Sequence, residues 1–385
     1  WGTNPAESDN SLFWRNIADY ARNGGKLIVV DTRLSMTAAK ATLWLAPFPG
    51  TDLVLAHALA RVIIEEDLYD HDFVEEWCHG FDEFKAAAFE RTLDEAAAVT
   101  QVPVEQIREA ARMYATSKPA GLLSGRGVDQ IGPNTASLHR VIAALRAITG
   151  NVDVPGGNVI GQACWGIEQP NWTGTWGYDE LLTPEESAKR IGVERYPMFA
   201  VGFKNLSSNA TIEAWQRGEV PIHAAYFATN NFLATMGAQA EQQLEWYKQI
   251  DFCVFQDLFM TPTMMALADV VLPAATYEER NGFGGLNPYR ISCINKAIEP
   301  VGETKADNTI FLELGKRLTN ALRPQNADIA WPWDSVEEMW DYALEDGGFT
   351  WEELRDATWK YPEFEYRKYE KGLLRPDGQP GFSTE

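Results

Sequence analysis

Residues 24–33 read GGKLIVVDTR, and this stretch decides the fold. Two glycines end the preceding helical pattern. The apolar run at 27–30 is short and rich in β-branched residues, which is typical of a buried strand. The run passes directly into Asp31 and Arg33, so a polar turn follows a buried strand. Helical patterns at 12–22 and 53–64 flank this strand, and the alternation predicts an α/β fold with a mainly parallel sheet.

The alternation continues on both sides of this strand. A helix is expected at 104–118, a further buried strand in AGLLSGRG at 120–127, and a helix at 137–148. Trp1-Gly2 running into Thr-Asn-Pro reads as the end of a strand whose first part precedes Trp1. The glycine-rich stretch 149–162 then interrupts the pattern and predicts a domain border.

The second half repeats the same pattern of strands and helices. Strands are expected at 224–227, 253–255 and 270–272, with a helix at 241–249 between the first two. The sequence therefore predicts two Rossmann-like α/β domains with mainly parallel sheets. The expected boundaries are residues 1–160 for the first domain, 161–320 for the second, and 321–385 for an acidic C-terminal extension.

Composition excludes several classes of function. The chain has 385 residues and a net charge of −22, which argues against binding to nucleic acid or to an anionic membrane surface. No apolar run reaches the roughly 20 residues that a membrane-spanning helix needs, so no membrane insertion is expected. The four cysteines form no C-x-x-C pair, so no zinc or iron–sulfur ligand set is expected, and no residue is assigned as a metal ligand.

The polar residues after the strands are the candidate binding residues, because ligands of parallel α/β sheets bind beyond the carboxyl ends of the strands. The turn at Gly2, Asn4 and Ser8 would suit phosphates, since its amides and a helix N-terminus point at one spot. Asp31 would suit a guanine, whose edge donates two hydrogen bonds to a carboxylate. The alternative is that Asp31 and Arg33 form an ordinary surface pair. The G-x-G-x-x-G fingerprint of nicotinamide enzymes is absent.

Five motifs in order carry a family resemblance. They are WGTNPAES, LIVVDTR, PGTDLVLAHALARVIIEEDLYDHDFVEEWCHGFDEF, VFQDLFMTPTMMALADVVLPAATYEERNG and GETKADN. Together the chain resembles the molybdopterin oxidoreductases of the dimethyl sulfoxide reductase family over most of residues 1–320. The resemblance implies two molybdopterin guanine dinucleotides whose dithiolene sulfurs hold one molybdenum or tungsten ion.

The resemblance also implies which residues hold each dinucleotide. One dinucleotide is expected on Gly2, Asn4, Ser8, Asp31, Arg33, Gly50 and Asp52. The other is expected on Thr229, Asn230, Gln256, Asp257 and Asp269.

The resemblance further implies that the chain is the central part of a larger catalytic subunit and is inactive alone. The iron–sulfur cluster and the protein ligand to the metal are expected upstream of Trp1, so no catalytic residue is assigned. A cap domain is expected after the C-terminal extension. A small-molecule substrate and an iron–sulfur electron-transfer subunit are the expected partners. Cytoplasmic and exported locations both stay open.

The resemblance implies oxygen-atom or hydroxyl transfer, or reductive dehydroxylation, coupled to electron transfer. Formate oxidation is not expected, because Ile160 stands where formate dehydrogenases of the family carry an arginine that orients formate. An aromatic stretch favours a planar substrate, although its side chains would equally pin a long loop to the core. The alternative function is a non-catalytic subunit of the same fold, as in respiratory complex I. The aromatic residues in question are Trp165, Trp172, Trp176 and Tyr178.

Overall fold

The chain forms two compact units. The computed structural model describes residues 1–8, 11–130, 134–160, 185, 188–195, 208–235, 237, 240–287, 290–322, 324, 331–360, 365–371 and 382–383. Unit 1 comprises Trp1–Ile160 and Phe364–Glu385, and unit 2 comprises Gly161–Glu363. The division into two domains and a C-terminal extension stays a prediction, as does the Rossmann-like assignment of each domain.

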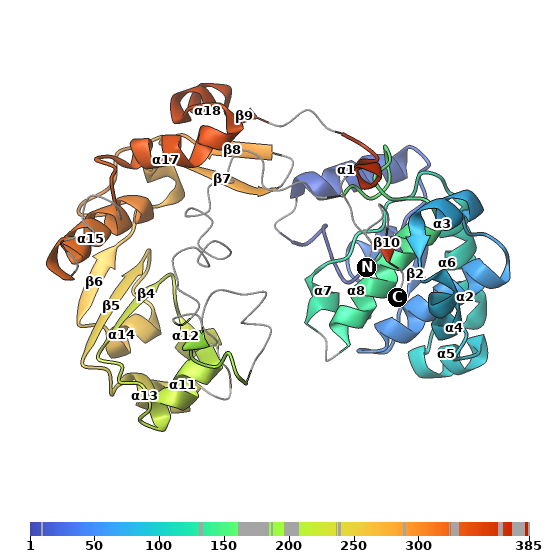
Figure 1. Ribbon diagram of the computed structural model, residues 1–385, viewed down its shortest axis with the longest axis horizontal. Helices are drawn as coiled ribbons and strands as arrows, with labels where there is room; N and C mark the ends of the chain where they lie inside the picture. Colours follow the sequence, from blue (N-terminus) through green and yellow to red (C-terminus); the bar gives the residue numbers. More distant parts are fainter. Residues whose placement is uncertain are drawn as a thin grey trace. The chain divides into compact units, whose positions relative to one another are not determined.

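Unit 1 is built around one buried helix. Its helices are α1 Ser11–Arg22, α2 Asp52–Glu65, α3 His71–Trp77, α4 Phe81–Ala88, α5 Leu93–Thr100, α6 Val104–Thr116, α7 Arg126–Asp129 and α8 Thr135–Ile148. Helix α2 packs against α4, α5, α6 and α8 (Figure 1). Leu55 and Ile63 of α2 are fully buried, and burial of such a side chain contributes about 1.5–3 kcal/mol. The helix is apolar on nearly all sides because it has neighbours on nearly all sides.

The sheet of unit 1 is short and parallel. Strand β1 (Ile28–Val30) pairs with β2 (Leu43–Leu45), with Val29 opposite Trp44. On the other side of β1, the Gly2 amide donates to the Val30 carbonyl at 3.0 Å. The first residues of the chain therefore extend the sheet beside β1.

The structure has no regular strand at 120–127, so the prediction of a strand there is wrong. The stretch lies beside residues 1 and 2, because the Gly125 amide donates to Trp1 and the Gly127 amide to Gly2, both at 2.9 Å. Its outer side bonds to side chains instead of a further strand. The Ala120 amide donates to Asn151, and the Leu122 amide donates to Asn158. A strand pattern is present, but no regular ladder forms.

The C-terminal residues belong to unit 1. Strand β10 (Phe382–Ser383) pairs in parallel with β3 (Cys78–His79). The short 3-10 helix η7 (Lys368–Glu370) lies between these residues and unit 2 in the sequence, and it packs on α3 through Tyr369, which is 2% exposed. This long return of the chain carries no local sequence signal, and the sequence did not predict it.

Unit 2 contains a three-stranded parallel sheet in the order β4-β5-β6. These strands are β4 Ala224–Ala228, β5 Phe252–Asp257 and β6 Val270–Pro273. The described helices of this unit are α11 Ser208–Gln216, α12 Phe232–Thr235, α13 Ala240–Tyr247, α14 Pro262–Leu267, α15 Asp307–Leu322, α17 Val336–Leu344 and α18 Trp351–Ala357. Phe227 stacks on Phe255 with ring centroids 4.5 Å apart, so aromatic packing joins β4 to β5.

A second, antiparallel sheet completes the described part of unit 2. Strands β7 (Gly282–Asn287), β8 (Arg290–Ile294) and β9 (Trp359–Lys360) pair in that order. Helices α17 and α18 cover a core that includes Ile291 and Trp340. The prediction of a mixed α/β fold with parallel sheets is confirmed, and this antiparallel sheet is an addition to it.

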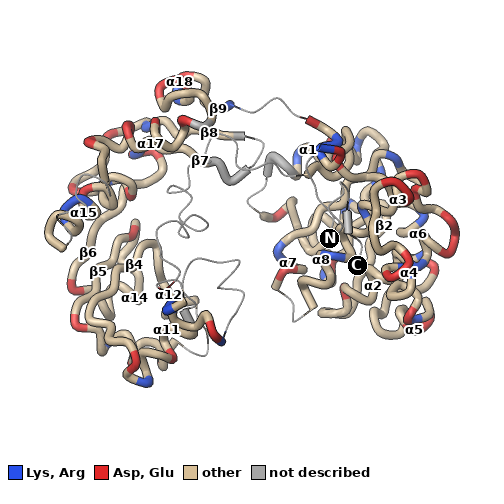
Figure 2. Tube along the Cα trace, in the orientation of Figure 1, with Lys and Arg blue, Asp and Glu red and all other residues tan. Residues whose placement is uncertain are grey.

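Charge and hydropathy agree with the composition. Figure 2 shows Asp and Glu on helices α3 to α6 of unit 1 and on α15, α17 and α18 of unit 2. Within the described residues, no helix has both the length and the apolar character needed to span a bilayer.

Candidate functional site

The first candidate turn follows the segment that extends the sheet of unit 1. The Asn4 carbonyl accepts from the amides of Glu7 and Ser8 at 3.1 and 3.0 Å. The Asn4 side chain accepts from the Thr37 hydroxyl at 2.7 Å and donates to Glu7. The Asn-Pro turn is therefore not a plain turn, because its side chain ties the segment after residue 2 to the loop after β1.

Asp31 and Arg33 lie directly after β1, as predicted. One Asp31 carboxylate oxygen accepts from the Arg33 amide at 3.0 Å. The other oxygen has no hydrogen-bond partner among the described residues, and it is available to a ligand. The Arg33 guanidinium lies 3.3 Å from the Glu7 carboxylate, with its side chain 68% exposed. The hydrogen bond from Asn4, together with Arg33, holds the pKa of Glu7 below its ordinary value.

Asp52 begins α2 and is 6% exposed. Its Oδ1 accepts from the Trp1 indole at 2.7 Å. Its Oδ2 is buried and has no partner within the described residues. Such an orphaned carboxylate oxygen is costly unless a ligand or water donates to it. Gly50, with φ of 83°, turns the chain into α2 in a conformation that side chains rarely adopt.

In unit 2, the predicted residues Thr229, Asn230 and Gln256 lie at or just after the carboxyl ends of β4 and β5. The Thr229 amide donates to the Gln256 carbonyl at 2.9 Å, and Thr229 has a positive φ of 51°. The Asn230 side chain accepts from the Phe232 amide at 3.1 Å.

Asp257 ends β5, and its carboxylate, like that of Asp31, accepts from backbone amides just after it. One of its carboxylate oxygens accepts from the amides of Leu258 and Phe259 at 2.7 and 3.4 Å. The second oxygen has no partner in the part of the chain that the structure describes. The two units thus present one fixed, half-satisfied carboxylate each, in both cases after a parallel strand.

Gln256 is 1% exposed, and its side chain is already engaged. It accepts from the Tyr226 hydroxyl and donates to Asp307, the first residue of α15. Burial and the charge of Asp307 raise the pKa of Tyr226. The side chain of Gln256 therefore fastens α15 to the sheet, and its geometry favours a structural role.

Asp269 lies at the other end of the sheet from the predicted group. Its Oδ2 accepts from the Cys253 amide at 2.7 Å, and Cys253 is near the beginning of β5. Asp257 ends the same strand, so four residues of extended chain, about 13 Å, separate the two positions. The structure does not bring Asp269 together with Thr229, Asn230 and Asp257.

Several residues of these turns were missed by the sequence analysis. Glu7 and Thr37 hold the first turn, and the buried Thr263 accepts from the Leu233 amide and donates to Asn231 in the second. Glu7 lies inside the quoted NPAES motif and was available to notice. Nothing in the sequence marks Thr263, whose partners are about 30 residues away.

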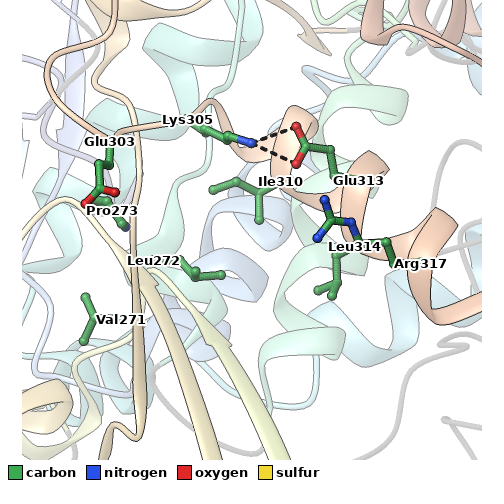
Figure 3. A pocket seen from close by; sticks show the side chains of 9 residues that line it. All are labelled: Val271, Leu272, Pro273, Glu303, Lys305, Ile310, Glu313, Leu314 and Arg317. Carbon is green, nitrogen blue, oxygen red and sulfur yellow. Dashed lines mark hydrogen bonds and ion pairs between the residues drawn. The ribbon is translucent and has the colours of Figure 1, made fainter.

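A cavity of about 370 Å³ lies elsewhere, between β6 and α15. Figure 3 shows Leu272 and Ile310 among the residues that line it, and Lys305 bonded to both carboxylate oxygens of Glu313 at 2.8 Å. Lys305 and Glu313 pair with each other, Glu303 and Arg317 also line this cavity, and no predicted site residue lines it. The described residues contain no cluster of three metal-ligating side chains. Trp165, Trp172, Trp176 and Tyr178 lie outside the described residues.

Comparison with known proteins gives a family match over most of the chain. The family model for molybdopterin oxidoreductases matches residues 1–317. Formate dehydrogenase H of Escherichia coli is 31% identical over 342 residues, which is 86% of this chain and 46% of that protein. Acetylene hydratase of Syntrophotalea acetylenica is 31% identical over 360 residues, which is 87% of this chain and 47% of that protein.

A solved structure gives the same result for the fold. Acetylene hydratase from Pelobacter acetylenicus superposes with a TM-score of 0.81 at 28% identity, covering 96% of this chain and 52% of that one. The chain spans about half the length of the relatives it matches. The family resemblance predicted from the five motifs is confirmed.

Proposed function

Because this chain belongs to the molybdopterin oxidoreductase family, we propose that it holds two molybdopterin guanine dinucleotides of a molybdenum or tungsten enzyme, one on each unit. The family implies a molybdopterin cofactor. The guanine dinucleotide form and the number of two are parts of the proposal. The observation that carries it is the repeated strand-end carboxylate, Asp31 in unit 1 and Asp257 in unit 2, each with one free oxygen.

The residues present fit a guanine dinucleotide. A guanine edge donates two hydrogen bonds, and a carboxylate that keeps one oxygen fixed by its own turn is preorganised to accept them. In unit 1, the orphaned Oδ2 of Asp52 offers a further buried acceptor. Arg33 is exposed beside Glu7, and a phosphate would compete with Glu7 for its guanidinium.

The proposed roles are divided among the predicted residues. Gly2, Asn4, Ser8 and Gly50 would shape the backbone around the first dinucleotide, while Thr229 and Asn230 would do so for the second. When bound, the cofactor would supply a metal that exchanges electrons and an oxygen atom or hydroxyl group with the substrate. We do not assign ligand contacts to Gln256 or Asp269, because the first fastens α15 and the second lies at the opposite end of the sheet.

The reaction proposed is oxygen-atom or hydroxyl transfer, or reductive dehydroxylation, of a small-molecule substrate. Electrons would be exchanged with an iron–sulfur partner subunit, which would accept them in an oxidation and supply them in a reductive dehydroxylation. The similar proteins include formate dehydrogenases, a hydratase and a thiosulfate reductase subunit, so the substrate does not follow from similarity. Ile160 argues against formate, because an apolar side chain cannot orient a carboxylate. The alternative is a subunit of the same fold that binds no pterin.

Cofactor analysis of the whole protein that carries this chain tests the proposal. Anaerobic purification followed by acid hydrolysis should release guanine nucleotide and a fluorescent oxidised pterin, together with molybdenum or tungsten by elemental analysis. Two guanines per metal ion is the expected ratio. A purified, folded protein that contains neither pterin nor metal would support the non-catalytic alternative, and a pterin without guanine would contradict the dinucleotide assignment.

A further inference from the structure

The glycine-rich loop 150–160 of unit 1 contains a buried ion pair with a distant part of the chain. Asp153 is 0% exposed, and its Oδ1 lies 2.8 Å from the Lys368 ammonium, whose side chain is 17% exposed. Its Oδ2 accepts from the Lys368 amide at 2.7 Å, and Oδ1 also accepts from the Ile160 amide at 3.0 Å. Asp153 itself has a φ of 53°, a conformation that side chains rarely adopt. Surrounding bonds must hold it there.

The segment that contains Lys368 is also held in place by contacts other than its ion pair with Asp153. We call residues 365–371 the strap. Tyr369 of the strap packs edge-on against Phe73 and Trp77 of α3, with ring centroids 5.5 and 5.1 Å apart. The Arg367 amide also donates to the Asp153 carbonyl at 2.9 Å. The strap therefore joins α3 to the loop, and Lys368 delivers its charge from a rigid base.

The loop in turn holds the segment 120–127 that flanks the candidate site. The Asn158 side chain accepts from the Leu122 amide and donates to the Leu122 carbonyl, both at 2.7 Å, in the manner of a neighbouring strand. Asn151 accepts from the Ala120 amide at 2.9 Å. Loop residues thus replace the missing outer strand of this sheet edge.

The segment 120–127 packs directly on the first candidate turn. A side chain at Gly125 would lie 2.3 Å from Thr3, and one at Gly127 would lie 2.6 Å from the Gly2 carbonyl. Distances this short leave no room for a side chain at either glycine, so the backbone of the segment lies directly against residues 2–3. A displacement of the loop would therefore reach the turn at Gly2 and Asn4 through backbone contacts alone.

We propose that Lys368 is a positioning residue for the candidate site of unit 1, acting through the buried pair with Asp153 to fix loop 150–160 and segment 120–127. The effect of Lys368 on the order and stability of segment 120–127 follows from the contacts described above and needs no bound cofactor. The consequence for cofactor binding rests on the proposed function.

The test uses the whole protein that carries this chain and follows amide hydrogen exchange by mass spectrometry. Lys368→Met removes the ammonium and leaves Asp153 buried without its counter-charge. Lys371→Met is the matched control, since Lys371 is in the same strap and pairs with Glu365 but is 72% exposed. The double variant Asp153→Asn, Lys368→Met removes both charges and keeps one of the two backbone hydrogen bonds, because an amide oxygen replaces only one of the oxygens that accept from the Ile160 and Lys368 amides.

Lys368→Met should raise exchange roughly tenfold or more in both 150–160 and 120–127, because a cooperative unit opens together. Lys371→Met should leave both segments at the wild-type rate, and the double variant should recover part of the protection, short of wild type by the one hydrogen bond that it loses. If Lys368→Met does not fold, a double variant that folds and is partly protected is the expected result.

Three results would overturn the proposal. Faster exchange of Lys368→Met confined to the strap would show that the loop does not depend on the pair. A double variant no better protected than Lys368→Met would show that the unpaired charge costs no more than the one hydrogen bond lost from residue 153, and that it is not the main cause. Equal effects of Lys371→Met would mean a general loosening of the strap. Guanine content is measured on the same preparations, so a wild-type protein without guanine would refute the proposed function and leave the exchange result standing.

Discussion

At the scale of single residues, Asp31 and Asp257 share a geometry that the sequence suggested only in part. Each follows a parallel strand, and each binds an amide two residues further on with one carboxylate oxygen. This turn fixes the side chain before any ligand arrives, so little side-chain entropy is lost on binding. Asp269 was expected only from the family resemblance; it precedes its strand, and its carboxylate accepts from the Cys253 amide.

Substitution of Asp52 should weaken cofactor binding without a large change in the stability of the fold. Asp52→Asn keeps an acceptor for the Trp1 indole and removes a buried charge whose Oδ2 has no partner among the described residues. The free energy of unfolding should therefore change by less than about 1 kcal/mol, with an increase more favoured than a decrease. A ligand donor to Oδ2 would meet an N–H group in the variant, and losing a charge-assisted bond costs about 1.5–3 kcal/mol.

Cofactor retention during dialysis, measured as guanine content, should accordingly fall toward half of the wild-type value, because only the dinucleotide of unit 1 is weakened, by about tenfold or more. Asp19→Asn is a suitable control, because Asp19 pairs with Arg22 on the surface of α1 and its side chain is 48% exposed. Unchanged retention in Asp52→Asn, with unfolding also unchanged, would mean that water satisfies Oδ2 and that Asp52 does not contact the cofactor.

At the scale of helices and strands, the sequence was most informative where one element provides its own signal. Helix α2 was predicted from its helical pattern at 53–64, and it is confirmed at Asp52–Glu65. The segment 120–127 misled because its apolar pattern is that of a strand. Its outer neighbours are the side chains of Asn151 and Asn158, which no periodicity can reveal.

The candidate site residues were likewise predictable only where a single element provides the signal. The positions after β1 and β5 were predictable, since strand ends are visible in sequence. The partners that hold them were not, because Thr37, Thr263 and Asp307 are brought in from separate parts of the fold. The strap of residues 365–371 is the extreme case, with its partner Asp153 more than 200 positions away.

The joint between α2 and α6 provides a prediction on pH dependence. Glu66 follows α2 and accepts from Arg112 at 2.6 and 2.9 Å and from Arg108 at 2.7 Å. These bonds, with Arg112 first, hold the pKa of Glu66 below its ordinary value of 4.5 in the folded protein. A lowered carboxyl pKa contributes stability above the unfolded pKa and loses it as the pH falls through the folded pKa.

Glu66→Gln should therefore lower the free energy of unfolding at pH 7 by about 1–3 kcal/mol. The difference from wild type should shrink as the pH drops below 4.5, where the wild-type carboxyl also becomes protonated. Urea unfolding at several pH values measures this difference. Glu65→Gln is the control, because Glu65 lies 3.6 Å from Arg61 and is 41% exposed, so its effect should be small at every pH. A difference for Glu66→Gln that is constant with pH would exclude the charge as its cause.

At the scale of the whole molecule, the chain repeats one structural arrangement, a parallel sheet with a carboxylate at the end of a strand, in two units. Each unit has its own parallel sheet, its own hydrophobic core and its own strand-end carboxylate. A nicotinamide site would need one such device in a single sheet, so the duplication itself favours a ligand with two similar parts. With a net charge of −22, each proposed guanine site would rely on specific contacts rather than on a general attraction for phosphate.

Two independent sites should respond to substitution separately. Asp31→Asn in unit 1 and Asp257→Asn in unit 2 each remove one charged acceptor, and neither variant alters a contact of the other unit's described residues. Because distant sites without shared partners behave additively, each single variant should lose about half of the bound guanine and the double variant nearly all of it. Guanine released per folded chain measures this directly, with Asp251→Asn, whose side chain is 72% exposed and pairs with His223, as the control. If either single variant lost all the guanine, the two dinucleotides would depend on each other, and if neither lost any, the strand-end carboxylates would not be guanine ligands.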